Sequence, residues 1–140
     1  MSKLVAQLKR HEGVKKFCYL CPAGFETIGV GRNISENNGL GLSDDEIDYL
    51  LQNDIKRCKQ ELIALSWFVD LDEVRQDAIV NLCFNLGLTR LMGFKLAVAA
   101  MAEGNYEKAA YEFYDSRWAK QVGSRADDVC HMIRTGKYPE

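Results

Sequence analysis

The segment that decides the fold class lies at residues 17–34 and reads FCYLCPAGFETIGVGRNI. Pro22-Ala-Gly24 is a turn signal between two short runs rich in aromatic and β-branched residues, which predicts a small β-hairpin. Gly29 and Gly31 follow at a point where we expect a second bend or a close backbone contact. Residues 35–42 are predicted to form a loop, since Ser, Asn and Gly make up most of that stretch.

Helical patterns occupy the chain on both sides of this hairpin. Apolar residues at positions 4, 5 and 8 mark a short first helix that ends before Gly13. Ser43-Asp-Asp-Glu46 is a capping box, and apolar residues recur after it at helical spacing as far as Leu62. Another helix opens at Asp70-Leu-Asp-Glu73, and further helices are predicted over residues 94–102, 106–114 and 125–134.

A small hairpin set among about seven helices is an α+β layout. A chain of 140 residues fits one domain, or a single unit with two lobes. We expect a small β-containing lobe over about residues 13–55 and a larger helical lobe made of residues 1–12 and 56–140. The first helix would pack back onto the helical lobe, and a cleft would lie between the two lobes.

The composition excludes several classes of protein. Hydrophobic residues make up 47% and charged residues 27%, which is ordinary for a globular domain. No apolar run approaches the ~20 residues of a membrane span, so we expect no stable membrane insertion. The net charge of −2 argues against a nucleic-acid partner, because such proteins carry a basic excess.

The cysteines and the first residues both indicate synthesis in a reducing cytoplasm. The five cysteines are odd in number and irregularly spaced, which is poor evidence for a disulfide framework. Charged residues return near the N-terminus before an apolar stretch of ~7–15 residues forms, so we expect no secretory signal.

Glu12 is the first candidate for catalysis. It follows the first helix and stands between His11 and Gly13, just before the hairpin. A carboxyl group at a helix end that faces a cleft can be partly desolvated, which keeps it protonated near neutral pH, as a general acid requires. A glutamate there also suits a plain surface position, so the assignment depends on the residues that follow.

Several motifs recur in a fixed order along the chain. Eight residues separate Glu12 from Cys21, five more separate Cys21 from Thr27, and Thr27-Ile-Gly-Val-Gly31 follows. Later blocks are Phe84-Asn-Leu-Gly87, Gly93-Phe94, Ser116-Arg-Trp118, Arg125-Ala126 and Arg134-Thr-Gly136. Together they resemble the phage-type lysozymes of glycoside hydrolase family 24 over nearly the whole chain. This resemblance implies a lysozyme-like α+β fold.

The family resemblance also implies a reaction, the hydrolysis of the β-1,4 bond between N-acetylmuramic acid and N-acetylglucosamine in peptidoglycan. It implies that Glu12 donates the proton to the leaving oxygen and that Thr27 holds the water, or the substrate, on the opposite face of the sugar. Arg125 resembles the arginine that approaches the catalytic glutamate from the helical lobe. We expect no metal and no cofactor, because nothing completes Cys18-Tyr-Leu-Cys21 as a zinc site.

Cys21 departs from the family, which has Asp at this position. Glycosidases normally use two carboxylates, and a thiol is mostly neutral at pH 7 unless its surroundings favour ionisation. Three readings stay open: Cys21 substitutes as thiolate nucleophile or base, it is a bystander beside Glu12 and Thr27, or the site is disabled. A base predicts an inverted product and a nucleophile predicts a retained one. Glu26 is a poor replacement, because neighbours on a strand face opposite sides.

The resemblance further implies a biological role. An endolysin made in the host cytoplasm without a signal peptide would reach its partner, the peptidoglycan, after a holin-like protein has permeabilised the membrane. A phage gene and a prophage remnant are equally compatible with this role, and we expect a monomer. The alternative is a catalytically impaired lysozyme-fold protein that binds the wall.

Some residues are expected to serve structure alone. Cys58, Cys83 and Cys130 occupy apolar helix positions and should be buried. Trp118 should pack in the core. By family resemblance, Arg32 and Asp54 are expected to form an ion pair.

Overall fold

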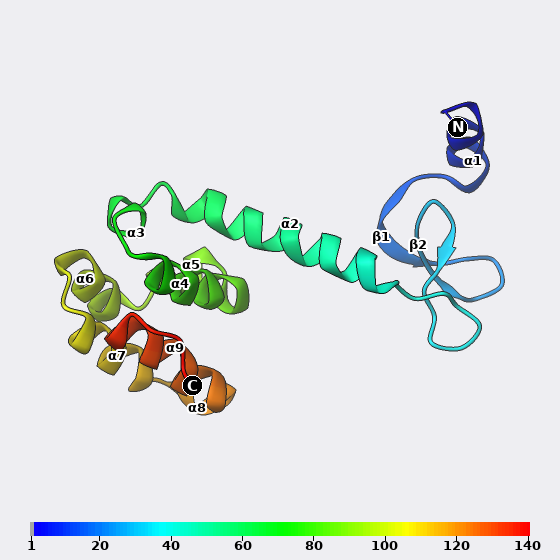
Figure 1. Cartoon of the computed structure of the whole chain (residues 1–140). Helices are drawn as coiled ribbons and strands as arrows, with labels where there is room; N and C mark the ends of the chain where they lie inside the picture. Colours follow the sequence, from blue (N-terminus) through cyan, green and yellow to red (C-terminus); the bar gives the residue numbers. More distant parts are fainter. Residues whose placement is uncertain (1) are drawn as a thin grey trace. The chain divides into compact units, whose positions relative to one another are not determined.

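The structure is a computed structural model that describes residues 2–140 (Figure 1). Its elements in chain order are α1 (Ser2–Glu12), β1 (Lys15–Leu20), β2 (Glu26–Gly29), β3 (Arg32–Asn33), α2 (Asp44–Leu62), α3 (Ser66–Val69), α4 (Glu73–Leu86), α5 (Leu88–Met92), α6 (Lys95–Glu103), α7 (Tyr106–Tyr114), α8 (Arg117–Val122) and α9 (Ser124–Thr135). This arrangement confirms the predicted α+β class, with many helices and one small sheet.

Most predicted elements are present with bounds within a residue or two. The helix predicted over residues 106–114 matches α7, and the helix after the capping box is α2, which begins at Asp44. The prediction missed α3, α5 and α8, which have four, five and six residues. Elements of one or two turns are too short to repeat an apolar face, so periodicity does not reveal them.

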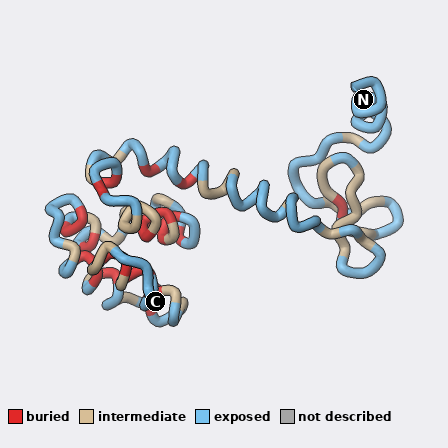
Figure 2. Tube along the Cα trace, viewed as in Figure 1, coloured by how far each residue is buried: buried red, intermediate tan, exposed pale blue. Residues whose placement is uncertain are grey.

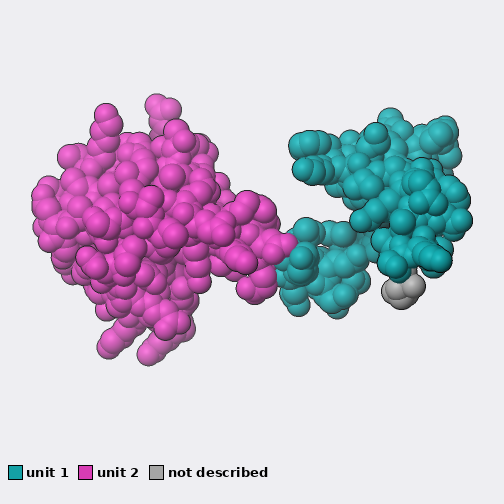
Figure 3. Space-filling view, turned by 90° about the horizontal axis from the view of Figure 1, so that it is seen from above, with its two compact units in different colours: residues 1–50 teal, residues 51–140 magenta. Residues whose placement is uncertain are grey.

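The chain divides into two compact units that differ in burial. Every buried apolar side chain among residues 2–140 lies between Cys58 and Ile133, within the unit of residues 51–140 (Figure 2). The other unit is residues 1–50, drawn in teal in Figure 3. Thr27 is the one buried side chain among its described residues. Among residues 2–140, no helix combines the length and the apolar character needed to cross a membrane.

Helix α1 belongs to the unit of residues 1–50. None of residues 2–12 is buried, and the helix ends where the Gly13 N–H donates to the Lys9 carbonyl at 2.9 Å. The predicted lobe bounds at residues 13–55, and the packing of this helix onto the helical lobe, stay predictions.

The sheet has three antiparallel strands in the order β1-β2-β3. Thr27 lies on the central strand, opposite Tyr19 on one side and Asn33 on the other. Gly29 and Gly31 make the second bend that the sequence predicts, with φ angles of 69° and 66°. Only glycine adopts such left-handed angles at little cost, so both positions set the path from β2 to β3.

The start of α2 is tied to β3 through one carboxylate. Glu46 Oε1 accepts hydrogen bonds from the Ser43 N–H at 2.8 Å and from Arg32 Nη1 at 2.5 Å. Arg32 Nη1 also donates to the Gly41 carbonyl at 3.1 Å. The predicted Arg32–Asp54 ion pair is wrong, because Arg32 pairs with Glu46 and Asp54 pairs with Arg57. The capping box already holds the Glu46 carboxylate within reach of Arg32.

The helical unit has a continuous core in which the expected structural residues are buried. Trp118 is 4% exposed, and its Nε1–H donates to Asn85 Oδ1 at 2.8 Å. Cys58, Cys83 and Cys130 are buried as predicted. Burial raises the pKa of the Cys83 and Cys130 thiols to about 12, so these groups stay protonated.

Glu46 gives the fold a specific dependence on pH. The Ser43 backbone N–H, together with the Arg32 guanidinium, lowers the pKa of Glu46 from 4.5 to about 2. A carboxylate whose pKa is lower in the folded state stabilises the fold above pH 4.5, and this stabilisation is lost as the pH falls toward 2. We expect Glu46→Gln to unfold at a lower temperature at pH 7, and the difference from the parent to shrink toward pH 2.

Thermal unfolding of both proteins followed by circular dichroism between pH 2 and pH 7 measures this difference. Asp45→Asn on the same turn of α2 is the matched control, and its difference from the parent should stay small. An equal loss for Glu46→Gln at every pH would contradict the assignment.

Candidate active site

Glu12 ends α1 with its carboxyl group lying against the bend between β2 and β3. A Cβ atom built on Gly31 would lie 2.5 Å from Glu12 Oε2 and 2.9 Å from its Cδ. Real Cβ atoms do not approach other atoms so closely, so a side chain at residue 31 would require the Glu12 carboxylate, the end of a flexible exposed side chain, to shift. The structure thus joins the two motifs on which the family resemblance depends, although 18 residues separate them in the sequence.

Thr27 lies at the centre of the sheet, and its hydroxyl group already donates one hydrogen bond. It is 3% exposed, and its Oγ1–H donates to the Phe25 carbonyl at 2.8 Å. A hydroxyl that donates its one proton keeps its oxygen lone pairs free to accept. Glu26 beside it is exposed, which agrees with the expectation that neighbours on this strand face opposite sides.

Cys21 directly follows β1 and opens the turn that leads to β2. Its backbone N–H donates to the Phe25 carbonyl at 2.9 Å, and its carbonyl accepts from the Gly24 N–H at 2.8 Å. These two bonds close the turn predicted at Pro22-Ala-Gly24 and fix the backbone that carries the thiol. The side chain is half-buried, so reagents and substrate can reach it.

The turn also favours ionisation of the Cys21 thiol. The backbone N–H of Phe25 lowers the pKa of this thiol below its ordinary value. The N–H groups of Ala23 and Gly24 add to the effect, while partial burial opposes it. Because hydrogen-bond donors stabilise the charged form, Cys21 supplies more thiolate near neutral pH than an ordinary cysteine.

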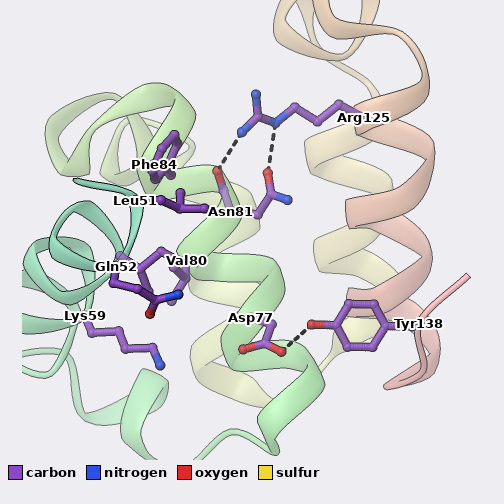
Figure 4. A pocket seen from close by; sticks show the side chains of 10 residues that line it. Leu51, Gln52, Lys59, Asp77, Val80, Asn81, Phe84, Arg125 and Tyr138 are labelled. Carbon is purple, nitrogen blue, oxygen red and sulfur yellow. Dashed lines mark hydrogen bonds between the residues drawn. The ribbon is translucent and has the colours of Figure 1, made fainter. Parts of the chain in front are cut away.

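Arg125 lies in the other unit, at the start of α9. Its Nε–H donates to Asn81 Oδ1 at 2.8 Å, and Nη2 donates to the Asn81 carbonyl at 3.5 Å (Figure 4). Asn81 belongs to α4, so this helix orients the guanidinium. Arg125 lines a hollow of about 470 Å³ with Asp77, Phe84 and Tyr138, all from residues 51–140. An arginine has five N–H donors, so others remain for a ligand.

Three of the four predicted site residues, Glu12, Cys21 and Thr27, lie in the same unit, residues 1–50. Glu12 meets the β2–β3 bend, while Cys21 and Thr27 adjoin at the other end of β2. Gly31 was predicted to need a close contact, but its partner was not identified. Asn81 was missed altogether, because no sequence pattern marks an amide that orients an arginine. Among residues 2–140, no cluster of His, Cys, Asp or Glu has the geometry to hold a metal ion.

Comparisons with known proteins agree on one family. A model of the phage lysozyme family matches residues 9–131, which include all four predicted site residues. "Probable T4-type lysozyme 1" of Dictyostelium discoideum is 26% identical over 163 residues, covering 97% of this chain and 96% of that protein. The "Endolysin" of Acyrthosiphon pisum secondary endosymbiont phage 1 is 31% identical over 118 residues, covering 84% of this chain and 80% of that protein.

A further relative belongs to a larger phage protein. The "Pre-baseplate central spike protein Gp5" of Enterobacteria phage T4 is 27% identical over 161 residues. The alignment covers 95% of this chain but only 28% of that protein. A segment similar to this chain therefore also occurs within a longer protein.

The contact between Glu12 and Gly31 makes a specific prediction. Gly31→Ala adds a methyl group where the carboxylate lies, so the carboxylate must move away. A displacement of about 1 Å in a reacting group costs about 100-fold in rate, and we expect a loss of that size in clearing purified bacterial walls. The turbidity of a wall suspension measures the rate.

Gly29→Ala is the matched control for this substitution. Its φ of 69° is close to the 66° of Gly31, but a Cβ at Gly29 meets nothing within 4 Å. Both variants should lose about 1 kcal/mol of stability from the left-handed backbone, while only Gly31→Ala loses activity. Equal activity in the two variants would contradict the close contact.

Proposed function

Because this chain belongs to the phage lysozyme family and is a lysozyme, a glycoside hydrolase, we propose that it cleaves the β-1,4 bond between N-acetylmuramic acid and N-acetylglucosamine in peptidoglycan. The observation that carries this proposal is the Glu12 carboxylate against Gly31, in the same unit as Thr27 and Cys21. A glycosidase needs an acid on one side of the bond and an activated water or nucleophile on the other.

Glu12 is the general acid in this proposal. It donates its proton to the glycosidic oxygen as the bond to the sugar breaks, so the leaving sugar departs as an alcohol rather than an alkoxide. Glu12 is exposed within residues 1–50, so the partial desolvation expected from the sequence is not found in this unit. The lack of a side chain at Gly31 lets the carboxyl group lie against the backbone. Gly31 therefore serves as a positioning residue for Glu12.

Thr27 and Cys21 act on the other side of the bond. The Thr27 oxygen accepts a hydrogen bond from water while its proton is held by the Phe25 carbonyl. A Cys21 thiolate then follows one of two routes. It removes a proton from that water, which inverts the anomeric carbon, or it attacks the carbon itself, forming a glycosyl-enzyme that water hydrolyses with retention.

Arg125 is a proposed substrate-binding or supporting residue. Its guanidinium is held by Asn81 on α4 and keeps further N–H groups that can donate to sugar or carboxylate oxygens. This role rests on the family resemblance and on the orientation that Asn81 provides. The wider role proposed is that of an endolysin, which depends on a holin-like protein for access to the wall.

Replacement of Glu12 tests the general acid directly. Glu12→Gln keeps the shape and the hydrogen-bonding capacity of the side chain but removes the proton that is transferred. We expect wall clearance to fall roughly 10²–10⁴-fold with unchanged thermal stability. Glu26→Gln, an exposed carboxylate on the same sheet, is the matched control and should keep the parent rate. Near-normal clearance by Glu12→Gln would overturn the assignment.

Selective alkylation tests the part taken by Cys21. Cys18 is exposed, whereas Cys58, Cys83 and Cys130 are buried, so Cys18→Ser leaves Cys21 as the accessible thiol. We expect iodoacetamide to inactivate this variant, and Cys21→Ala to clear walls about 100-fold more slowly than the parent. The anomer of the fresh product, read by NMR, separates the base from the nucleophile.

Other outcomes of this experiment identify the competing interpretations. Full activity after alkylation and in Cys21→Ala would make Cys21 a bystander. Binding to walls by an inactive parent protein, together with clearance by Cys21→Asp, would support the alternative of a catalytically impaired wall-binding protein.

A further inference from the structure

Two hollows on the helical unit share one wall. The first, of about 470 Å³, is lined by Glu107, His131 and Arg134, and the second, of about 460 Å³, by Asp115, Lys120 and Gly123. Tyr111, Tyr114 and Asp127 line both hollows, so the two are adjacent. We call this pair of hollows the tyrosine groove; it is made by α7, α8 and α9 within residues 51–140. Volumes of several hundred Å³ are typical of small-ligand sites.

The two tyrosines present their rings to solvent side by side. Residues three apart share one face of a helix, so Tyr111 and Tyr114 form a pair along α7. Their exposed fractions are 63% and 54%. Large exposed rings with a polar tip are favoured where a ligand offers both apolar and polar surface. The faces of pyranose sugars, with C–H bonds on the ring and hydroxyls at its rim, have this character.

The polar groups of the groove are oriented rather than randomly placed. Tyr114 donates its hydroxyl proton to Asp127 Oδ1 at 2.9 Å. This hydrogen bond to Asp127 raises the pKa of Tyr114 above its ordinary value. Arg134 forms no ion pair with another side chain in residues 2–140, so its donors are available. The groove therefore offers an acceptor, Asp127, and a donor, Arg134, beside the rings.

The charges of the groove select the class of ligand. Three carboxylates, of Glu107, Asp115 and Asp127, face two cationic groups, of Lys120 and Arg134. A nearly balanced lining gives little attraction for a strongly charged polymer, because binding of polyanions needs a clear basic excess. It suits a neutral ligand with many hydroxyl and amide groups.

The groove lies on the side of α9 away from Arg125. Successive residues of an α-helix are ~100° apart, so Asp127 and Arg134 lie roughly 160° and 180° around α9 from Arg125. The hollow that contains Arg125 and the tyrosine groove share no lining residue. A ligand in the groove therefore does not occupy the hollow beside Arg125.

We propose that the tyrosine groove binds a stretch of the N-acetylated glycan strand as a second, non-catalytic subsite. Tyr111 and Tyr114 stack against sugar faces, while Asp127 and Arg134 hydrogen-bond hydroxyl and acetamido groups. This inference rests on the proposed function for the identity of the polymer. Such a subsite would hold the enzyme on an insoluble wall between cleavage events.

The experiment measures wall binding and catalysis separately. All variants are made in full-length protein carrying Glu12→Gln, so the wall is not consumed, and binding is measured by sedimentation with purified peptidoglycan. Tyr111→Ser with Tyr114→Ser should weaken binding about tenfold. Tyr111→Phe with Tyr114→Phe keeps the ring faces and should bind nearly as the parent does. Chitotetraose, a soluble neutral probe, should perturb the NMR signals of Tyr111 and Tyr114.

The same substitutions are then made with Glu12 intact. The serine pair should slow the clearance of insoluble walls and leave the cleavage rate on short soluble wall fragments unchanged. Tyr49→Ser, on α2 and 69% exposed, is the matched control and should bind as the parent does. Tyr111→Ser alone serves if the double variant is unstable, because Tyr111 takes part in no hydrogen bond that holds α7 to α9.

Unchanged wall binding by folded serine variants would overturn the proposal, as would an equal loss in the phenylalanine pair. Failure of the proposed function has a different signature. If the parent protein never clears walls but the serine pair still weakens wall binding, the proposed binding groove would stand. The proposed enzyme activity would then be wrong.

Discussion

The contact between the Glu12 carboxylate and Gly31 is the constraint on which the rest of the site depends. It requires a position without a side chain and a backbone with positive φ, and glycine alone meets both conditions. The contact places the Glu12 carboxylate beside the β2–β3 bend. The same β2 strand carries Thr27 in the centre of the sheet, with neighbours on both sides. A change at this bend would therefore reach both Glu12 and the strand that carries Thr27.

Cys21 separates two properties that an aspartate combines. An aspartate at the start of a turn accepts hydrogen bonds from backbone N–H groups and also carries a permanent negative charge near neutral pH. Here the turn amides remain aimed at the side chain, but the charge is conditional on loss of the thiol proton. If Cys21 has the proposed role, its turn supplies the same backbone donors as it would to an aspartate, and the side chain carries different chemistry. A lysozyme of this kind would draw part of its pH dependence from a sulfur atom.

Local patterns predicted much of the fold, and contacts between distant residues were beyond them. The capping box gave the start of α2, and the turn signal gave the hairpin, because both depend on residues a few positions apart. The Arg32 partner was mistaken, since two carboxylates lay on the same helix and the capping geometry decided between them. The family motifs named Glu12 and Thr27 as site residues. The contact between Gly31 and the Glu12 carboxylate joins residues far apart in the sequence, so local patterns did not predict it.

The uneven burial of the two units has a consequence for how the protein opens. Apolar burial is confined to residues between Cys58 and Ile133, so the hydrophobic effect stabilises the helical unit far more than the sheet. The strands β1 to β3 are held mainly by ladder hydrogen bonds and glycine bends, which contribute less free energy per residue. Partial unfolding should therefore begin in the segment that carries Glu12, Cys21 and Thr27, with amide hydrogens exchanging there first. We expect this segment to be the first part of its unit to yield to heat and proteolysis.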